Sequence, residues 1–386
     1  MNNGQPLESA FGGLLDIPRS VETPSLVVDL DRVQTNLDEM ATFAREHGVD
    51  LVPHVKTHRT PEFANLQMRS GASALCVAKL SEAEEFARSG FRSFVMAYPI
   101  VGEEKFERAK RLVRQGVQIR LTTDNLDQGE LLAASFARDG LVADVAIKVD
   151  TGFHRVGVEP ARAVGFAVAL ARLDGIRVRG FIAHEGHAAG ADDDCGMHDL
   201  SIDSGEQMVW AAEEARSAGV PVDTVSVGST ATAKHTPLVS GITEVRPGIY
   251  PFYDYGQVLR GTVGLDRCAA RVLTTVVSSA APDRAIIDAG SKSMGQDLLA
   301  IWFANGAAGH GLVIGEPGWS LYKLSEEHGW MRWDGEGPPR PLAVGQRLQI
   351  LPNHICSAFH VLGESVVCRN GAVEATWVAT ARGCSK

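Results

Sequence analysis

The chain has 386 residues, 45% of them hydrophobic and 22% charged, which allows a sizeable core and argues against wholesale disorder. Its formal net charge of −10 disfavours nucleic acid and anionic membrane as partners, and a small molecule is the expected one. No apolar run is long enough to span a bilayer, and the first residues lack a cationic start and a long hydrophobic stretch, so we expect neither a membrane span nor a secretory signal. The six cysteines are scattered without a CxxC pair, which favours a cytoplasmic protein over a disulfide framework.

Short β-branched runs alternate with amphipathic stretches from about residue 24 to 250. The predicted strands are 25–30, 51–56, 73–78, 93–98, 117–123, 143–150, 177–184 and 224–228. Amphipathic helices are predicted between these strands. Ser81 and Glu84 have the spacing of a capping box, which predicts that one of these helices begins there. Strand–helix units in series imply parallel strands joined by helical crossovers. Their number favours an α/β fold of the (β/α)₈ TIM-barrel type, although an open doubly wound sheet has the same alternation.

The pattern changes after about residue 258, where strand-like runs are separated by turn residues and helical periodicity almost disappears. These runs are 270–282, 284–290, 345–353, 364–370 and 372–383. They predict a second, mostly β domain. We therefore divide the chain into residues 1–24, which join the β domain, residues 25–258, which form the barrel, and residues 259–386, which form the β domain.

Lys56 directly follows the apolar run LVPHV. In a parallel barrel this position is the carboxyl-terminal mouth, where active sites are found. A lysine there can be partly desolvated, which lowers its pKa and frees the amine to form a Schiff base with a carbonyl compound. The alternative is a surface lysine at the end of a strand.

Several segments, in the expected order, resemble the D-threonine aldolases and D-serine dehydratases, which are metal-assisted relatives of alanine racemase. The segments are TPSLVVDLDRVQTNL, PHVKTHRTPE, KVDTGFHRVGV, VRPGIYPFYD and PNHICSAF. Each motif is weak alone, but together they are specific and cover nearly the whole chain. The resemblance implies pyridoxal 5′-phosphate (PLP) on Lys56 in the barrel, a divalent metal in the β domain, and a homodimer.

The resemblance also assigns residues to the cofactor. Arg155 is implied to face its phenolic oxygen, Arg246 its pyridine nitrogen, and His184 to lie behind or beside its ring. A permanent cation at the pyridine nitrogen keeps that atom unprotonated and makes the ring a weaker electron sink, which gives a metal ion a reason to assist. A pair between Arg246 and Glu244 is the alternative. The phosphate is expected on backbone N–H groups of two short segments, represented by Gly228, Ser229, Thr230, Gly248, Ile249 and Tyr250.

His354 and Cys356 are two positions apart and would point to one face of a strand. An imidazole and a thiolate together suit Zn²⁺, with Mn²⁺ or Mg²⁺ as alternatives, and two protein ligands leave positions for water and substrate. An HxC triplet alone says little, so the resemblance of PNHIC to the family's metal site carries this assignment. The family often has asparagine four residues after the cysteine, where this chain has His360, a difference that bears on the choice of metal.

Histidines are expected to gather near the barrel mouth, at positions 54, 58, 184 and 187. We predict His187, in HEGH, as the base for the substrate hydroxyl and His58 as an alternative contact with substrate. HEGH lacks the HExxH spacing of a zincin. From the family's dimer we expect His328 to approach the site from the β domain of a second subunit.

The function that the resemblance implies is retro-aldol cleavage of a D-β-hydroxy-α-amino acid to glycine and an aldehyde. The alternative is dehydration of D-serine or D-3-hydroxyaspartate, in which Lys56 removes the α-proton and the metal withdraws the hydroxyl. HEGH and ITEVRPG look closer to the aldolase branch, which decides our preference. Racemisation needs no metal and normally requires a second base. A non-catalytic PLP-binding protein would resemble the barrel alone, so the β domain and the HxC motif argue against it.

Overall fold

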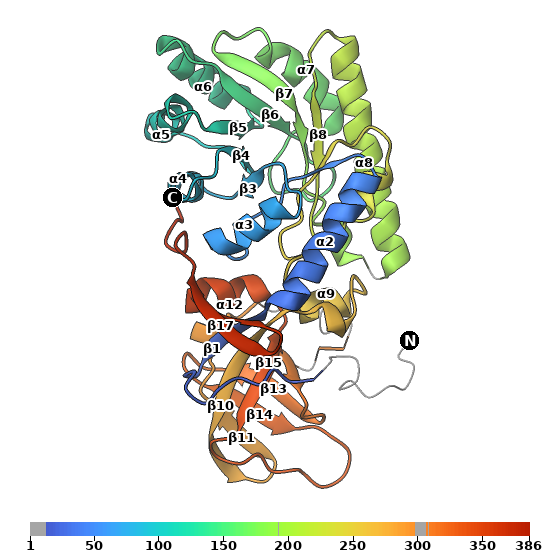
Figure 1. The fold of residues 1–386 in the computed structure, drawn as a ribbon. Coiled ribbons are helices and arrows are strands. Elements are labelled where there is room, and N and C mark those ends of the chain that lie inside the picture. Colours follow the sequence, from blue (N-terminus) through green and yellow to red (C-terminus); the bar gives the residue numbers. More distant parts are fainter. Residues whose placement is uncertain (1–12, 192, 298–305, 308) are drawn as a thin grey trace. The chain divides into compact units, whose positions relative to one another are not determined.

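The computed structural model describes residues 13–191, 193–297, 306–307 and 309–386. They form two compact units, which we describe one at a time (Figure 1). The barrel unit comprises Glu39–Lys56, Pro61–Gly248 and Ala381–Lys386, and the β unit comprises the chain up to Asp38, Thr57–Thr60 and Ile249–Thr380. No helix in the described part of the chain combines the length and the apolarity needed to cross a bilayer.

Eight parallel strands make the sheet of the barrel unit, in the order β2-β9-β8-β7-β6-β5-β4-β3. The two ends of this sheet also meet, because Val55 N–H donates to the Cys76 carbonyl at 3.0 Å and Cys76 N–H donates to the Pro53 carbonyl at 2.8 Å. The closed ring confirms the predicted barrel and excludes the open sheet. The strands are β2 (Asp50–Leu51), β3 (Leu75–Val77), β4 (Ser93–Met96), β5 (Gln118–Thr123), β6 (Ala143–Lys148), β7 (Ile176–Ile182), β8 (Thr224–Val227) and β9 (Glu244–Val245).

Helices follow the barrel strands and pack one apolar face inward. In α5, for example, Phe106, Ala109 and Leu112 are buried, while Glu103 and Glu104 at its start are exposed, as the 3.6-residue period requires. The helices are α3 (Pro61–Arg69), α4 (Leu80–Arg88), α5 (Glu103–Arg114), α6 (Leu126–Arg138), α7 (Pro160–Leu170) and α8 (Asp194–Ser217), and α2 (Leu30–Glu46) spans both units.

The predicted capping box at Ser81 and Glu84 is wrong. Helix α4 already begins at Leu80, and the carboxylate of Glu82 accepts the Lys79 N–H. Glu82 is fully buried at this helix start. The carboxylate that caps the first turn is therefore that of Glu82, two positions before the predicted Glu84.

A nine-stranded sheet, in the order β11-β14-β13-β12-β15-β10-β1-β16-β17, makes the β unit, and β10 additionally pairs with β11. The six strands from β11 to β10 therefore form a ring of their own, which the other three extend. The strands are β1 (Ser25–Asp29), β10 (Ala270–Ala281), β11 (Arg284–Ile287), β12 (Gly311–Ile314), β13 (Trp319–Leu324), β14 (Gly329–Trp333), β15 (Arg347–Pro352), β16 (Glu364–Arg369) and β17 (Ala372–Val378), and the short helices are α9 (Tyr255–Leu259), α10 (Ser291–Met294) and α12 (Ile355–Leu362).

The assignment of residues 25–30 to the barrel is wrong. Strand β1 pairs with β10 and β16 in the β unit, and the two-residue β9 completes the barrel instead. Val27 and Val28 are both fully buried, so β1 is apolar on both faces and would suit either sheet. Of the segment predicted to join the β domain, residues 1–12 lie outside the described part, whereas Pro18 and Val21 accept hydrogen bonds from Arg347 of β15 at 2.8 Å.

Candidate active site

The predicted cofactor residues of the barrel unit lie where its strands end. Lys56 comes after β2, His184 after β7, Gly228 after β8 and Arg246 after β9. Because the strands are parallel, these positions share the carboxyl-terminal end of the barrel, where ligands bind in this architecture. The structure thus brings to one end of the barrel residues that are far apart in the sequence.

Arg246 is buried at this end, with 5% of its surface exposed. Its guanidinium donates to the Ser226 hydroxyl and to the Ala183 carbonyl. Glu244, which we considered as its partner, instead accepts a hydrogen bond from Arg120 at 2.5 Å. The alternative of an Arg246–Glu244 pair is therefore wrong, and Arg246 places a permanent cation inside the barrel end.

Arg155 and His184 line one small cavity of about 10 Å³ together with Lys148 and Phe153. The Phe153 ring lies 5.4 Å from the His184 ring and 4.8 Å from the Arg155 guanidinium. Burial lowers the pKa of His184 to about 3, and its Nδ1 lies 3.1 Å from the Gly228 carbonyl. His184 is therefore a neutral imidazole that donates from Nδ1.

Lys148, the last residue of β6, is a functional candidate that the sequence reasoning missed. It is 3% exposed, and burial, followed by the charge of Arg246, lowers its pKa to about 7. Lys56, by contrast, is exposed, so the desolvation predicted for it is absent here. The sequence did contain a sign of this candidate, because Lys148 ends the apolar strand ADVAIK. On desolvation alone Lys148 is the better Schiff-base amine, whereas the resemblance favours Lys56.

We expect Lys148→Met to stabilise the cofactor-free protein, most strongly at low pH. The unfolded chain keeps this proton up to the ordinary pKa of 10.5, whereas the folded state releases it near pH 7. The stability of the wild type therefore rises from pH 7 to 10.5, and the penalty of the buried amine is fully present below pH 7. This penalty of burying the charged Lys148 amine lowers the free energy of unfolding by an amount on the order of a few kcal/mol. Urea denaturation at pH 6.5 and 9.5 tests this, and an equal gain at both pH values would contradict it.

Gly228 allows two segments of the predicted phosphate site to approach closely. Its φ is 134°, and a Cβ there would lie 2.6 Å from the backbone nitrogen of Arg246, so a larger residue would not fit. Its N–H donates to the buried carboxylate of Glu185 at 2.8 Å. This predicted phosphate donor is therefore engaged within the protein in the present structure.

Two more of the predicted donors also have protein acceptors. Ser229 N–H donates to the Thr232 hydroxyl and Gly248 N–H to the Thr230 hydroxyl, both at 3.1 Å. Ile249 and Tyr250 follow at the start of a β-unit segment. A bound phosphate would have to replace these hydroxyls and the Glu185 carboxylate as acceptor. The glycine-lined approach, the buried guanidinium and the neutral imidazole nevertheless fit PLP.

His187 has a buried ring nitrogen without a partner among the described residues. Its Nδ1 is buried and has no hydrogen-bond partner among the described residues, while its Nε2 lies 3.4 Å from the Ser204 hydroxyl. The ring rests on Gly152 of the DTG segment, where a Cβ would lie 3.2 Å from Nε2. His187 therefore stays our candidate base.

The structure gives His58 a different place. It is completely buried in the β unit, its Nδ1 accepts the Thr60 N–H at 3.1 Å, and its ring lies 5.8 Å from that of Phe252. A ring enclosed in this way supports the local backbone, so the geometry does not support the predicted contact with substrate. His54 is half-buried beside Lys56, and burial lowers its pKa. His328 is exposed in the turn between β13 and β14.

His354 and Cys356 lie at the start of helix α12, and the prediction of a strand there is wrong. Strand β15 ends at Pro352, His354 is the N-cap residue, and Cys356 is in the first helical turn. The buried carboxylate of Asp254 accepts the Ile355 N–H at 3.1 Å, which supports the start of the helix.

The His354 imidazole nevertheless lies beside a carboxylate and a cysteine sulfur. Its Nδ1 is 2.7 Å from the Asp297 carboxylate. Burial alone would lower the pKa of His354, but the Cys356 sulfur and Asp297 raise it to about 11. An imidazole and a cysteine sulfur beside a carboxylate are donors that a divalent cation could bind.

The donor set suits an open metal site. A carboxylate behind Nδ1 is the usual support for a metal-binding histidine and leaves Nε2 for the ion. The Cys356 sulfur lies 3.4 Å from the Thr57 hydroxyl. Over the described ranges no three His, Cys, Asp or Glu side chains converge on one metal position, so His354 and Cys356 would leave several positions to water and substrate. His360 lies 3.3 Å from the Arg59 guanidinium.

We expect Asp254→Ala to destabilise the protein and weaken the metal site together. The carboxylate caps two helix starts, because it accepts N–H groups of Gln257 at 3.0 Å and Ile355 at 3.1 Å. Its loss leaves buried donors unpaired, which costs about 1–3 kcal/mol. Urea denaturation and metal titration measure the two effects. Asp254→Asn keeps one oxygen acceptor and should therefore lose less stability and less metal affinity than Asp254→Ala. If Asp254→Ala bound the metal as tightly as the wild type does, the supporting role of Asp254 would be contradicted.

The barrel with cations at its strand ends and the separate β domain define a PLP-dependent protein with the alanine racemase fold. Residues 28–255 match the family model of the alanine racemase N-terminal domain, and residues 269–368 match that of a putative serine dehydratase domain. The chain belongs to the D-threonine aldolase and D-serine dehydratase-like family of this fold.

Named relatives span nearly the whole chain. The D-threo-3-hydroxyaspartate dehydratase of Delftia sp. (strain HT23) is 34% identical over 357 residues, 88% of this chain and 92% of the relative. The D-threonine aldolase of Arthrobacter sp. is 31% identical over 370 residues, 95% and 94% of the two chains. The structure of the Delftia enzyme has a TM-score of 0.87 at 32% identity and covers 93% of this chain and 98% of its own. A D-threonine aldolase from Filomicrobium marinum has a TM-score of 0.84 at 28% identity, with 97% and 100% covered.

Proposed function

We propose that this protein is a PLP- and divalent-metal-dependent lyase that cleaves D-β-hydroxy-α-amino acids to glycine and an aldehyde. The observation that carries the proposal is the His354–Cys356 pair in a chain whose barrel has cofactor-type residues at its strand ends. When bound, PLP supplies an electron sink for the negative charge at the α-carbon, and a metal supplies a Lewis acid for the substrate hydroxyl.

The residues of the chain then have separate tasks. Lys56 holds the cofactor, and Arg246 keeps a cation at the barrel end, where it donates to Ser226 and the Ala183 carbonyl. His187 takes the proton of the β-hydroxyl through its unpartnered Nδ1. His354 and Cys356 hold the metal, with Asp297 orienting the imidazole.

Variants of a relative support the metal assignment. Solved structures include a histidine-to-alanine mutant of D-threo-3-hydroxyaspartate dehydratase and a cysteine-to-alanine mutant in the metal-free form, each with a TM-score of 0.87 to this chain. The two mutated residues are two positions apart, as His354 and Cys356 are here. Within the β unit Cys356 contacts Thr57, the residue that follows Lys56 in the chain.

A dehydratase is the second candidate, because the Delftia relative with 34% identity is one. The same residues serve both reactions. The difference is which bond at the α-carbon breaks: the bond to the β-carbon in an aldolase, or the bond to hydrogen in a dehydratase.

Turnover of D-threonine, with and without a chelator, distinguishes these functions. Acetaldehyde and glycine support the aldolase, whereas 2-oxobutanoate and ammonia support the dehydratase. D-3-Hydroxyaspartate and D-serine should be assayed in parallel, because relatives named for them are in the same family. Bound PLP without turnover of any of the three would favour a non-catalytic PLP-binding protein.

We also propose that the enzyme acts in the cytoplasm as a homodimer, with His328 of one subunit near the site of the other. The scattered cysteines support the compartment, and the family resemblance supports the dimer. Light scattering measures the mass in solution, and a monomer that is fully active would contradict the dimer.

A further inference from the structure

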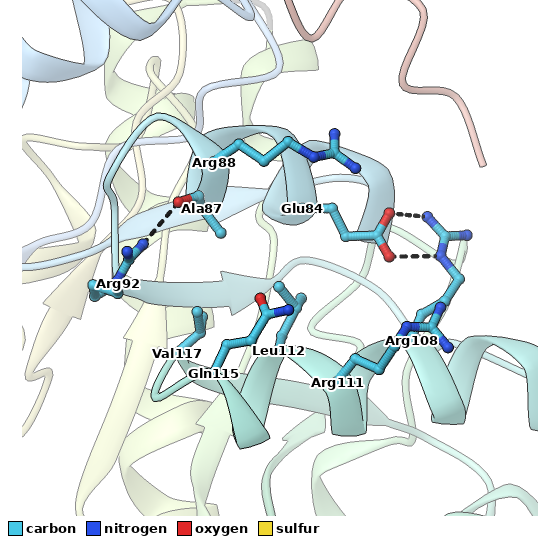
Figure 2. Close-up of a pocket in the computed structure, with 9 residues that line it drawn as sticks. All are labelled: Glu84, Ala87, Arg88, Arg92, Arg108, Arg111, Leu112, Gln115 and Val117. Carbon is cyan, nitrogen blue, oxygen red and sulfur yellow. Dashed lines mark hydrogen bonds and ion pairs between the residues drawn. The ribbon is translucent and has the colours of Figure 1, made fainter.

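The barrel unit has a cavity of about 420 Å³ between helices α4 and α5 (Figure 2). Two guanidinium groups in its wall have acceptors within the protein. Arg108 donates to the Glu84 carboxylate at 2.8 and 2.7 Å, and Arg92 donates to the Ala87 carbonyl at 2.7 Å (Figure 2). These two arginines therefore serve the fold of the unit, and its candidate for a further ligand site is a pair of histidines elsewhere.

Two partly buried histidines of the barrel unit face each other across a short gap. His198 lies in the second turn of α8, and His235 lies in the segment 228–239, which follows β8. Their Nδ1 atoms are 3.3 Å apart, while the ring centroids are 5.4 Å apart and the ring planes meet at 80°. Both Nδ1 atoms therefore lie on the facing edges of the two rings.

Packing on either side of the pair holds both histidines in place. Met197, which precedes His198, is buried in one cluster with Ala231 of the segment 228–239. Gly205, two turns farther along α8, lies against Val239, because a Cβ there would be 2.8 Å from a Val239 methyl carbon. The helix and the segment thus fit closely before and after the pair, which fixes the separation of the two nitrogens.

The second ring nitrogen of His235 faces a carboxylate. Its Nε2 lies 3.9 Å from Asp194, in the first turn of α8, which favours a proton on Nε2 and leaves the lone pair on Nδ1. Burial lowers the pKa of His235 more than Asp194 raises it, so the ring is neutral at pH 7. The neighbouring cation, Lys234, is paired with Glu39. A neutral imidazole with a carboxylate near its far nitrogen is the form in which histidine binds metal ions.

The distance between the two nitrogens is that of two ligands on one ion. Nitrogens that bind the same tetrahedral Zn²⁺ at about 2.0–2.1 Å lie about 3.3–3.4 Å apart, and the Nδ1 atoms of His198 and His235 are 3.3 Å apart. Without an ion, His198 has to donate its Nδ1 proton to His235. In the part of the chain that the structure describes, no third His, Cys, Asp or Glu side chain joins the pair as a ligand, so water would complete the coordination.

We propose that His198 and His235 form a second metal site, which binds a divalent transition-metal ion such as Zn²⁺ through the two Nδ1 atoms. Imidazole suits Zn²⁺, whereas Mg²⁺ prefers oxygen ligands. On binding, the proton of His198 moves from Nδ1 to Nε2, so both imidazoles stay neutral. The ion links α8 to the segment 228–239, which begins with the predicted phosphate donors. Because the pair lacks a thiolate, it binds more weakly than His354 and Cys356 and fills only when Zn²⁺ is added.

Calorimetric titration of PLP-loaded Cys356→Ala with Zn²⁺ tests the proposal, because this variant lacks the predicted catalytic metal. It should bind one Zn²⁺ per chain, and Mg²⁺ should not compete. Cys356→Ala/His198→Gln should bind at least about tenfold more weakly, since even a group that only supports a ligand is worth about 10–100-fold in metal affinity. Cys356→Ala/His47→Gln, which changes an exposed histidine after α2, should bind as Cys356→Ala does.

Three results would overturn the proposal: no binding of Zn²⁺ by Cys356→Ala, equal binding after His198→Gln, or an equal loss after His47→Gln. In the first two cases the histidines share only a proton. Zn²⁺ should raise the melting temperature of Cys356→Ala but not that of Cys356→Ala/His198→Gln, and the melting temperature without Zn²⁺ shows whether each variant folds. If His198→Gln does not fold, His235→Gln replaces it in the same assays. None of these measurements uses turnover, so their outcome is independent of the proposed function.

Discussion

Lys56→Ala should lower kcat/KM for D-threonine by about four orders of magnitude. The amine that holds PLP is lost, and with it the covalent positioning of the cofactor at the barrel end. Reduction of the wild-type holoenzyme with borohydride, followed by peptide mapping, should place the cofactor on Lys56. In the Lys56→Ala protein this label should be absent, although PLP can still bind without a covalent bond.

Lys148→Met is the matched control, because Lys148 is a second amine at a strand end of the barrel and its pKa is lowered to about 7. It should keep the borohydride label on Lys56. A label on Lys148 in the wild type would transfer the cofactor role to the buried amine and contradict the assignment made from the resemblance. The position of the borohydride label thus distinguishes Lys148, which burial favours as the Schiff-base amine, from Lys56, which the family resemblance favours.

Cys356→Ala should remove the metal and lower activity by about two to three orders of magnitude, because the hydroxyl of the substrate loses its Lewis acid. Metal analysis should find about one divalent ion for each wild-type chain and almost none in the variant. Chelation should reproduce the loss in the wild type, and added Zn²⁺ or Mn²⁺ should restore activity there but not in the variant. The absorbance of bound PLP should be the same in both proteins.

Cys195→Ala controls for the loss of a thiol, since Cys195 is exposed on α8 in the barrel unit. It should retain both metal and activity. Full activity of Cys356→Ala without metal would contradict the metal-dependent mechanism, while loss of PLP absorbance in the same variant would indicate general damage to the fold.

The sequence by itself determined the class of fold and the positions that carry chemistry. Alternating apolar runs identify strands and helices because burial repeats every two or every 3.6 residues. Polar residues after such runs, like His184 and Arg246, then fall at one end of a parallel barrel. The motifs around Lys56 and His354 added the family, which periodicity alone could not supply.

Only the tertiary structure decided which segments meet. Strand β1 is apolar on both faces, so its own residues could not choose between two sheets. His354 and Cys356 start a helix rather than a strand, and Asp254, about a hundred positions earlier, supports that start. The pKa of Lys148 depends on burial and on Arg246 from another strand. Local sequence records a residue's own preferences, whereas pairing, desolvation and charge proximity depend on neighbours that the folded chain brings from far away.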